Sequence, residues 1–142
     1  MHCDVDLEWC SSNNAGTIVT PAGKVSYSAL GRMEGNGPTP EVLLIAAISS
    51  CYSITLSNVL QAASLPQTHI SVHADGVIVR EFGREQFVRV TVNPTICGAD
   101  ALRRDAYEEA AIAARDGCQI GRSIRGNVAY VVGDVTLPQS NH

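Results

Sequence analysis

The sequence predicts an α+β fold in a single domain spanning residues 1–142. Three observations lead to this prediction: a long apolar helical segment over residues 40–63, an alternating hairpin pattern over residues 69–92, and a second helical segment over residues 101–116. Strand-like segments precede, separate and follow these helices, unlike the regular alternation of a doubly wound parallel sheet. A chain of 142 residues has room for one core and not for a second domain.

The N-terminal part has the pattern of short strands separated by turns. Alternation places Val5, Leu7 and Trp9 on one face of the first strand. Turns rich in Ser, Asn, Pro and Gly separate the segments. Strands are expected over residues 4–9, 17–19 and 24–29. A glycine-rich loop comes next, over residues 31–38, and its two charges make it a candidate wall of a site.

The long apolar segment is predicted to be the central helix of the fold. Thr39 can cap it, Pro40 suits the first helical position, and Glu41 meets the positive end of the helix dipole. From Val42 onward there is almost no charge for a full helix length, so the helix is expected to be buried on every face. Interspersed Ser and Thr residues and the lack of basic flanks argue against a membrane span. Cys51 lies in its middle.

The elements after this helix are expected in the order strand, strand, helix, strand. Pro66 limits the helix, and the next element is a hairpin of residues 69–81 and 86–92, broken at Asn93-Pro94. Asp100 can cap the second helix, Gly117 ends it, and Cys118 opens a further helical turn. A stripe of small residues on the second helix is expected to face the core: Leu102, Ala106, Ala110 and Ala113. The last strand is expected over residues 128–137.

Composition argues against several classes of protein. The net charge is −4 and the ten Lys and Arg residues form no basic stripe, which disfavours a nucleic-acid partner. Acidic residues are mixed with apolar ones at positions 1–10, a pattern unlike a signal peptide, so a cytoplasmic protein is expected. The five cysteines contain no Cys-x-x-Cys pair, and the spacing of the histidines matches no zinc pattern, so neither a disulfide framework nor a metal is expected.

Two of the cysteines stand in contexts that favour thiol chemistry. A lone cysteine such as Cys51 in a buried helix is ordinarily a small hydrophobic residue. Cys118, however, comes after a helix end and begins a new turn, where amide dipoles favour a thiolate. Arg32 and Glu41 bracket the loop that enters the Cys51 helix. Peroxide chemistry needs such a set, because a cation must keep the attacking thiol ionised and a second thiol must condense with the sulfenic acid.

The motifs around these cysteines resemble a known family. Residues 39–53 resemble the Asn-Pro-Glu-x-Leu…Ala-Cys-Phe-Ser signature of the OsmC/Ohr family, the osmotically inducible and organic hydroperoxide resistance proteins. Residues 116–120 resemble its second-cysteine motif, and residues 125–128 resemble the segment after that motif in the Ohr branch. Residues 31–35 resemble the OsmC branch. The resemblance extends over nearly the whole chain.

The resemblance implies a thiol-dependent peroxidase that reduces organic hydroperoxides to alcohols. Cys51 would be the peroxidatic thiol and Cys118 the resolving one. Arg32 would hold Cys51 as a thiolate and orient the peroxide, and Glu41 would orient Arg32 through a charge-assisted pair. The family uses no haem, flavin or metal and is turned over by external dithiols such as reduced lipoyl groups. Its fold has antiparallel sheets around a long buried central helix, and two chains interlock into a homodimer with sites at the subunit boundary.

Two positions depart from the family pattern. Gln119 stands where the family usually has proline after the second cysteine, so the turn around Cys118 is expected to differ. The first turn lacks the arginine that the Ohr branch carries there. Only Arg32, in the OsmC-like place, can fill that role, which favours the OsmC branch.

The helix geometry adds an expectation about assembly. Glu41 and Cys51 are ten residues apart in one helix, which separates them by roughly 15 Å along its axis. They cannot share a site within one chain. A two-fold axis could place Glu41 and Arg32 of one subunit beside Cys51 of the other. We therefore expect composite sites, two per dimer.

A second class of function stays open: a non-catalytic redox sensor or small-molecule-binding protein in which the Cys51–Cys118 pair reports oxidation. The presence of both thiols together with Arg32 and Glu41 favours the enzyme. The remaining cysteines have no partner at catalytic spacing and are expected to be incidental: Cys3, Cys10 and Cys97.

Overall fold

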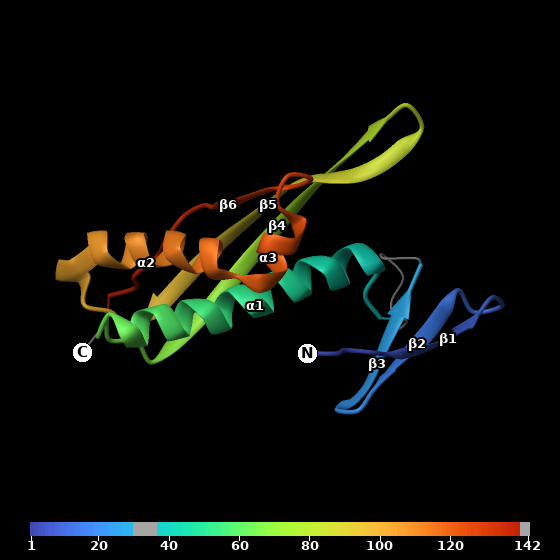
Figure 1. Ribbon diagram of the computed structural model, residues 1–142, viewed down its shortest axis with the longest axis horizontal. Helices are drawn as coiled ribbons and strands as arrows, with labels where there is room; N and C mark the ends of the chain where they lie inside the picture. The colour runs from blue at the N-terminus through green and yellow to red at the C-terminus, as the bar shows by residue number, and fades with distance from the viewer. Residues whose placement is uncertain (30–36, 140–142) are drawn as a thin grey trace. The chain divides into compact units, whose positions relative to one another are not determined.

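The computed structural model describes residues 1–29 and 37–139, and within them the chain has the predicted α+β content (Figure 1). It divides into two compact units, Met1–Leu44 and Ile45–His142. The elements in chain order are β1 (Asp6–Cys10), β2 (Ala15–Thr20), β3 (Gly23–Ser28), α1 (Pro40–Ala62), β4 (His69–Glu81), β5 (Arg84–Cys97), the 3-10 helix η1 (Ala101–Arg103), α2 (Arg104–Gly117), α3 (Gln119–Ile124) and β6 (Ala129–Val132).

The N-terminal unit is built on an antiparallel sheet in the order β1-β2-β3. Trp9 and Tyr27 stack on it with ring centroids 5.9 Å apart. Gly16 lies beneath the Tyr27 ring, where a side chain would collide at 2.6 Å. The face that alternation assigned to Val5, Leu7 and Trp9 is exposed in the single chain.

The start and the end of α1 are both set by local hydrogen bonding. The Thr39 hydroxyl accepts a hydrogen bond from the Val42 N–H at 3.4 Å, as expected for the N-cap. At the other end Ser64 adopts a left-handed conformation (φ 56°), and the Leu65 N–H bonds to the Leu60 carbonyl at 2.9 Å. This is a Schellman-type termination, so the helix ends before Pro66.

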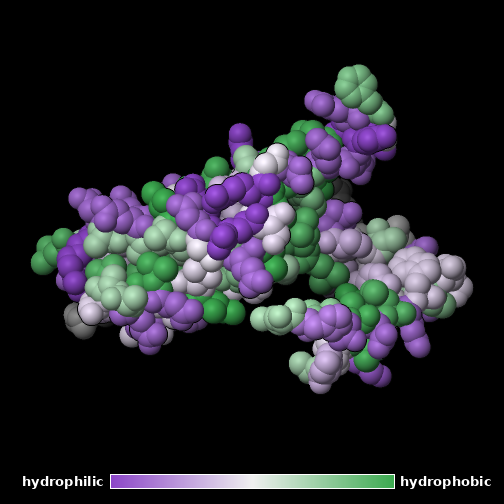
Figure 2. All heavy atoms as spheres, in the orientation of Figure 1, coloured by the Kyte–Doolittle hydropathy of each residue, from purple (hydrophilic) through white to green (hydrophobic). Residues whose placement is uncertain are grey.

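The single chain buries α1 on one face, so the predicted burial on every face depends on cover from a partner chain and stays a prediction. Its fully buried residues recur every four positions on one face: Ile48, Tyr52, Leu56 and Leu60. The opposite face is open, with Ile54 64% exposed, and Val42 in the first turn of the helix is 52% exposed. Neighbouring elements of the chain cover only one side of the helix, and Figure 2 shows hydrophobic residues at the surface of both units. By length and composition alone α1 could also cross a membrane, which for a single helix is weak evidence.

The second unit contains a sheet in the order β4-β5-β6. The β4–β5 hairpin is antiparallel, with His69 opposite Cys97, and confirms the predicted alternation. The expectation of purely antiparallel sheets is wrong at one pair, because β5 and β6 are parallel. Two helices lie between these strands in the sequence, and such a crossover permits parallel pairing. The last strand is also shorter than predicted, and an isolated bridge from Thr95 to Thr136 lies beyond its end.

Asn93-Pro94 does not break β5, contrary to the prediction. The strand continues to Cys97, and Pro94 pairs with Val72 of β4. Val92 and Pro94 direct their carbonyls to the N–H groups of Gly133 and Thr136, at 2.9 and 3.0 Å. The Pro94 nitrogen, which carries no hydrogen, therefore faces the segment beyond the end of β6. Regular pairing between β5 and β6 has ended there, so no N–H donor is required at this position.

The second predicted helix is divided into η1 and α2. Asp100 caps η1 as expected, because its carboxylate accepts a hydrogen bond from the Leu102 N–H at 3.1 Å. The predicted small-residue stripe is partly wrong, because Leu102 is 96% exposed and Ala113 is exposed as well. The residues of α2 that are buried are Tyr107, Ala110, Ala111 and Ala114. The observed stripe shares only Ala110 with the predicted one and otherwise lies about one position further along α2.

Candidate active site

Cys51 lies in the middle of α1 and is half-buried. Burial acts to raise the pKa of its thiol, but hydrogen bonding outweighs burial and the pKa is lowered from its usual range. The groups that lower the pKa are the backbone N–H of Ile120, the Cys118 thiol and the backbone N–H of Gln119. The Thr55 hydroxyl contributes least, and it donates its hydrogen bond to the Cys51 carbonyl at 2.9 Å. The first turn of α3 therefore stabilises the Cys51 thiolate, in agreement with the preference of thiolates for amide donors at the start of a helix.

Cys118 stands between α2 and α3 and is fully buried. Its sulfur accepts a hydrogen bond from the Gly121 N–H at 3.4 Å and lies 4.0 Å from the Ile48 carbonyl oxygen of α1. Burial raises the pKa of this thiol, and its interaction with Cys51 raises it further. At neutral pH Cys118 is therefore the protonated member of the pair.

The structure brings the two predicted thiols together, because each acts on the pKa of the other. Cys51 is the more accessible and the more acidic, whereas Cys118 is enclosed and less acidic. Both are free thiols. This asymmetry suits a two-thiol redox site, because the reachable sulfur ionises more readily and a second is held beside it for disulfide formation.

Two tyrosines pack beside the thiols. Tyr52 donates its hydroxyl hydrogen bond to the Ala111 carbonyl at 3.0 Å, and its ring meets the Tyr130 ring edge-on, with centroids 6.4 Å apart. Tyr130 comes from β6 and packs against Gly121, where a side chain would overlap its ring. Reasoning from the sequence missed Tyr130, because a tyrosine in a β-branched strand carries no signal of proximity to a cysteine on another element.

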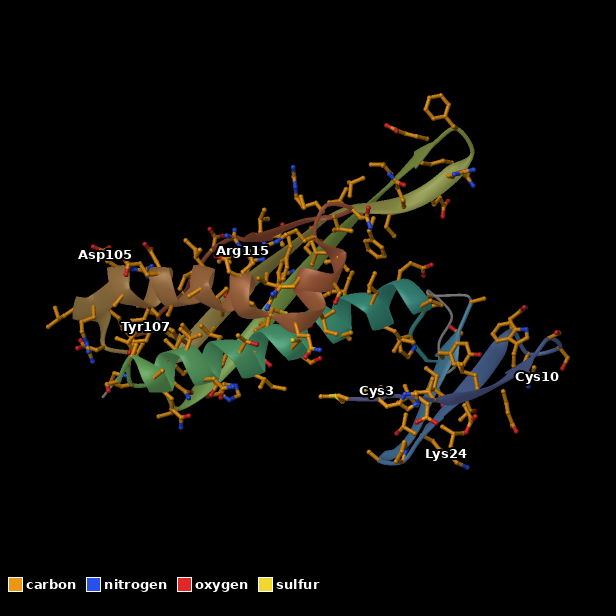
Figure 3. The ribbon with its side chains drawn as sticks, in the orientation of Figure 1. Cys3, Cys10, Lys24, Asp105, Tyr107 and Arg115 are labelled. Atoms are coloured by element: carbon orange, nitrogen blue, oxygen red, sulfur yellow. The ribbon has the colours of Figure 1, made fainter. Side chains whose placement is uncertain are left out.

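A small charged cavity of about 200 Å³ lies beside Gly121 and Tyr130. Its wall includes Tyr130 and the two guanidinium groups of Arg115 and Arg125. The Asp116 carboxylate accepts from Arg115 at 3.0 Å and lies 3.8 Å from Arg125. Arg115 projects from α2, as Figure 3 shows.

Of the other two predicted site residues, one lies outside the described residues and the other lies ten residues before Cys51 in α1. Arg32 lies outside the described residues, so its role stays a prediction. Glu41 is in the first turn of α1 and is exposed. Cys3 and Cys10 belong to the N-terminal unit and are exposed (Figure 3), and Cys97 is half-buried at the end of β5. Over residues 1–29 and 37–139 no group of three or more His, Cys, Asp or Glu side chains is placed to hold a metal ion.

The protein has an α+β fold, and its two paired thiols lie between α1 and the junction of α2 and α3. The chain belongs to the family of OsmC-like proteins, whose model matches residues 33–132. Among curated proteins it is similar to YmaD of Bacillus subtilis (strain 168), with 27% identity over 125 residues that cover 82% of this chain and 81% of that protein.

Solved structures show the same fold. An OsmC-like protein from Mycoplasma pneumoniae superposes with a TM-score of 0.85 at 13% identity, covering 98% of this chain and 99% of that one. An organic hydroperoxide resistance protein OsmC from Legionella pneumophila gives 0.72 at 21% identity, covering 94% and 96%. The organic hydroperoxide resistance protein OhrB of Bacillus subtilis gives 0.68 at 19% identity, covering 95% and 98%. At these identities the likeness establishes the fold.

The lowered pKa of Cys51 predicts a distinct pH dependence of its reactivity. Only the thiolate is alkylated, so a lowered pKa preserves reactivity at pH values where an ordinary cysteine is protonated. In the native protein, alkylation of Cys51 by iodoacetamide should reach half its maximal rate at a lower pH than in the same protein unfolded in urea. Mass spectrometry of the Cys51 peptide measures both profiles. Coincident profiles, or a native profile displaced to higher pH, would contradict the assignment.

Proposed function

We propose that this protein is a thiol-dependent peroxidase that reduces organic hydroperoxides to alcohols. The observation that carries the proposal is the pairing of an accessible, acidic Cys51 with a buried, protonated Cys118. Membership of the OsmC-like family supports it, and so do the names of two structural neighbours, which are organic hydroperoxide resistance proteins.

The proposed cycle has three steps. The Cys51 thiolate attacks the terminal oxygen of the hydroperoxide, the O–O bond breaks as the S–O bond forms, and the alkoxide takes a proton and leaves as the alcohol. Cys118 then loses its proton and attacks the sulfenic sulfur, forming the disulfide and releasing water. An external dithiol, such as a reduced lipoyl group, finally reduces the disulfide and is itself oxidised to a cyclic disulfide. This cycle needs no metal, haem or flavin.

In the proposed homodimer, Arg32 and Glu41 complete the site. Arg32 would keep Cys51 ionised and orient the peroxide, with Glu41 holding the guanidinium in place. Because Glu41 and Cys51 are ten residues apart in α1, the pair would come from the partner subunit. The uncovered apolar residues of α1 support an interface there. We place the enzyme in the cytoplasm, where its thiols would stay reduced between turnovers.

Substitution of Ile54 by glutamate is expected to separate the proposed dimer. Ile54 is 64% exposed in the single chain, so the change should barely affect folding of an isolated chain but would bury a charge in an interface formed by α1. Light scattering after size exclusion should change from twice the 15.1 kDa chain mass to the chain mass itself. Leu102→Glu, at a 96% exposed position on η1, is the matched control and should remain dimeric. A wild-type monomer with full activity would rule out the composite site.

Steady turnover is the test that separates an enzyme from a redox sensor. With cumene hydroperoxide and excess dithiol, the enzyme should consume many equivalents of peroxide per chain, whereas a sensor would be oxidised once and stop. Apolar residues around Cys51 should favour the alkyl hydroperoxide over hydrogen peroxide, because burial of alkyl surface contributes about 25 cal/mol per Å². Consumption that stops after one equivalent would refute the peroxidase.

A further inference from the structure

The hydroxyl of Tyr130 is a buried polar group of a kind that normally makes a hydrogen bond. Its oxygen is shielded from solvent and makes no hydrogen bond within residues 1–29 and 37–139. Buried hydroxyls are normally paired, and an unpaired one in a native structure indicates either strain or function. The group beside it is the sulfur of Cys118, with which it interacts.

The fold leaves the Tyr130 ring little freedom to turn away from this sulfur. The ring occupies the space over Gly121 where a side chain would otherwise stand. On another side it meets the Tyr52 ring at 67° with centroids 6.4 Å apart. The Tyr52 hydroxyl donates its hydrogen bond to the Ala111 carbonyl, so it is not a donor to the same sulfur.

One donor already bonds to this sulfur, and a second lies close enough to affect its pKa. The Gly121 N–H reaches the Cys118 sulfur at 3.4 Å, and the Tyr130 hydroxyl approaches it from β6. A neutral thiol is a weak acceptor, whereas a thiolate is a strong one, and hydrogen bonds to charged groups are the stronger kind. These donors would therefore stabilise the Cys118 thiolate more strongly than the neutral Cys118 thiol. The ionisable groups that interact with Cys118 are Cys51 and Tyr52 from α1 and Tyr130 from β6. The cavity beside Gly121 and Tyr130 is lined by Arg115 and Asp116 from α2 and by Arg125 after α3.

We propose that Tyr130 is a positioning residue for the resolving thiol, donating its hydroxyl hydrogen bond to the Cys118 sulfur whenever that sulfur carries negative charge. The inference rests on the proposed peroxidase function and extends it to the reductive half of the cycle. Burial raises the pKa of the Tyr130 hydroxyl, which keeps it protonated and able to donate throughout.

The exposure of the two sulfurs determines the step at which this donor acts. In the Cys51–Cys118 disulfide, an incoming dithiol can reach the half-buried Cys51 but not the fully buried Cys118. The reductant thiolate bonds to the Cys51 sulfur, the S–S bond breaks, and its electron pair passes to Cys118. Cys118 leaves as a thiolate and then takes a proton, while the second thiol of the reductant displaces Cys51 and closes its own disulfide. A hydrogen bond that stabilises the leaving thiolate speeds this step.

Tyr130→Phe tests the proposal, because it removes the hydroxyl and keeps the ring. Loss of one charge-assisted hydrogen bond should raise the pKa of Cys118 by about one unit and slow reduction of the disulfide by dithiol roughly tenfold. The Cys118 titration is read from the ¹³Cβ shift of labelled cysteine in a Cys51→Ser background. The first, stoichiometric reduction of cumene hydroperoxide by Cys51 should change less than about twofold. Thermal unfolding of the reduced protein should not be weakened, because the lost hydroxyl has no partner there.

Tyr52→Phe is the matched control, since it removes a buried hydroxyl from the adjoining ring that is bonded to Ala111 instead. It should leave the Cys118 titration and the disulfide reduction rate unchanged. Tyr130→Phe behaving as wild type in both measurements, or Tyr52→Phe matching its effects, would overturn the proposal. Should the wild-type protein fail to reduce peroxide, the function is wrong. The Cys118 titration and the reduction of a disulfide formed with a chemical oxidant would still decide the role of Tyr130.

Discussion

Replacing Cys51 by serine is expected to abolish peroxide consumption, with a loss on the order of a thousandfold or more. A serine hydroxyl is not ionised at neutral pH, and the groups that lower the pKa of Cys51, chiefly the Ile120 N–H and the Cys118 thiol, cannot make it an effective nucleophile. The measurement is the rate of cumene hydroperoxide loss with excess dithiol.

Cys97→Ser provides the matched control for this experiment. Cys97 is also a half-buried free thiol, but it lies at the end of β5, away from the Cys51–Cys118 pair. This variant should keep full activity. Peroxide consumption that survives in Cys51→Ser, or that is lost in Cys97→Ser instead, would show that the nucleophile has been assigned to the wrong sulfur.

Replacing Cys118 by serine is expected to separate the first reduction from turnover. Cys51 should still reduce one equivalent of hydroperoxide, somewhat more slowly because the Cys118 thiol helps to lower the pKa of Cys51. Steady turnover by dithiol should fall at least about tenfold, and excess peroxide should carry Cys51 on to the sulfinic and sulfonic acids. Stopped-flow kinetics gives the first step, and the mass of the Cys51 peptide gives the oxidation state.

The opposite pattern would contradict the resolving role of Cys118. If Cys118→Ser turns over at the wild-type rate and Cys51 stays free of sulfinic acid, the external reductant resolves the sulfenic acid directly. In that case the burial of Cys118 beside Cys51 would serve only packing, and the reductive role given to Tyr130 would have no thiolate to act on.

Local chemistry explains which parts of the fold are predictable. Thr39 and Pro40 mark the start of α1 because capping depends on a few adjacent residues. The alternation of the hairpin likewise places Val90 and Val92 in the core. The tolerance of Pro94 within β5 is not predictable in this way, because it depends on the C-terminal segment, which bonds to β5 from about 40 residues further along the chain.

The candidate site is predictable to a similar extent. The motifs point to Cys51 and Cys118, and the structure brings both sulfurs together. Tyr130 is not predictable, because only the parallel pairing of β5 with β6 brings its ring over Gly121. The apolar sequence of α1 predicts burial, but it does not specify which of its faces stays open in the single chain.

The most direct test of the account is the product of a single oxidation. Reduced protein is mixed with one equivalent of cumene hydroperoxide, quenched with an alkylating agent and mapped by mass spectrometry without reduction. The account predicts a peptide pair joined through Cys51 and Cys118, with Cys3, Cys10 and Cys97 recovered as alkylated thiols. Recovery of Cys51 and Cys118 as alkylated thiols, or a disulfide that joins Cys51 to another cysteine, would contradict it.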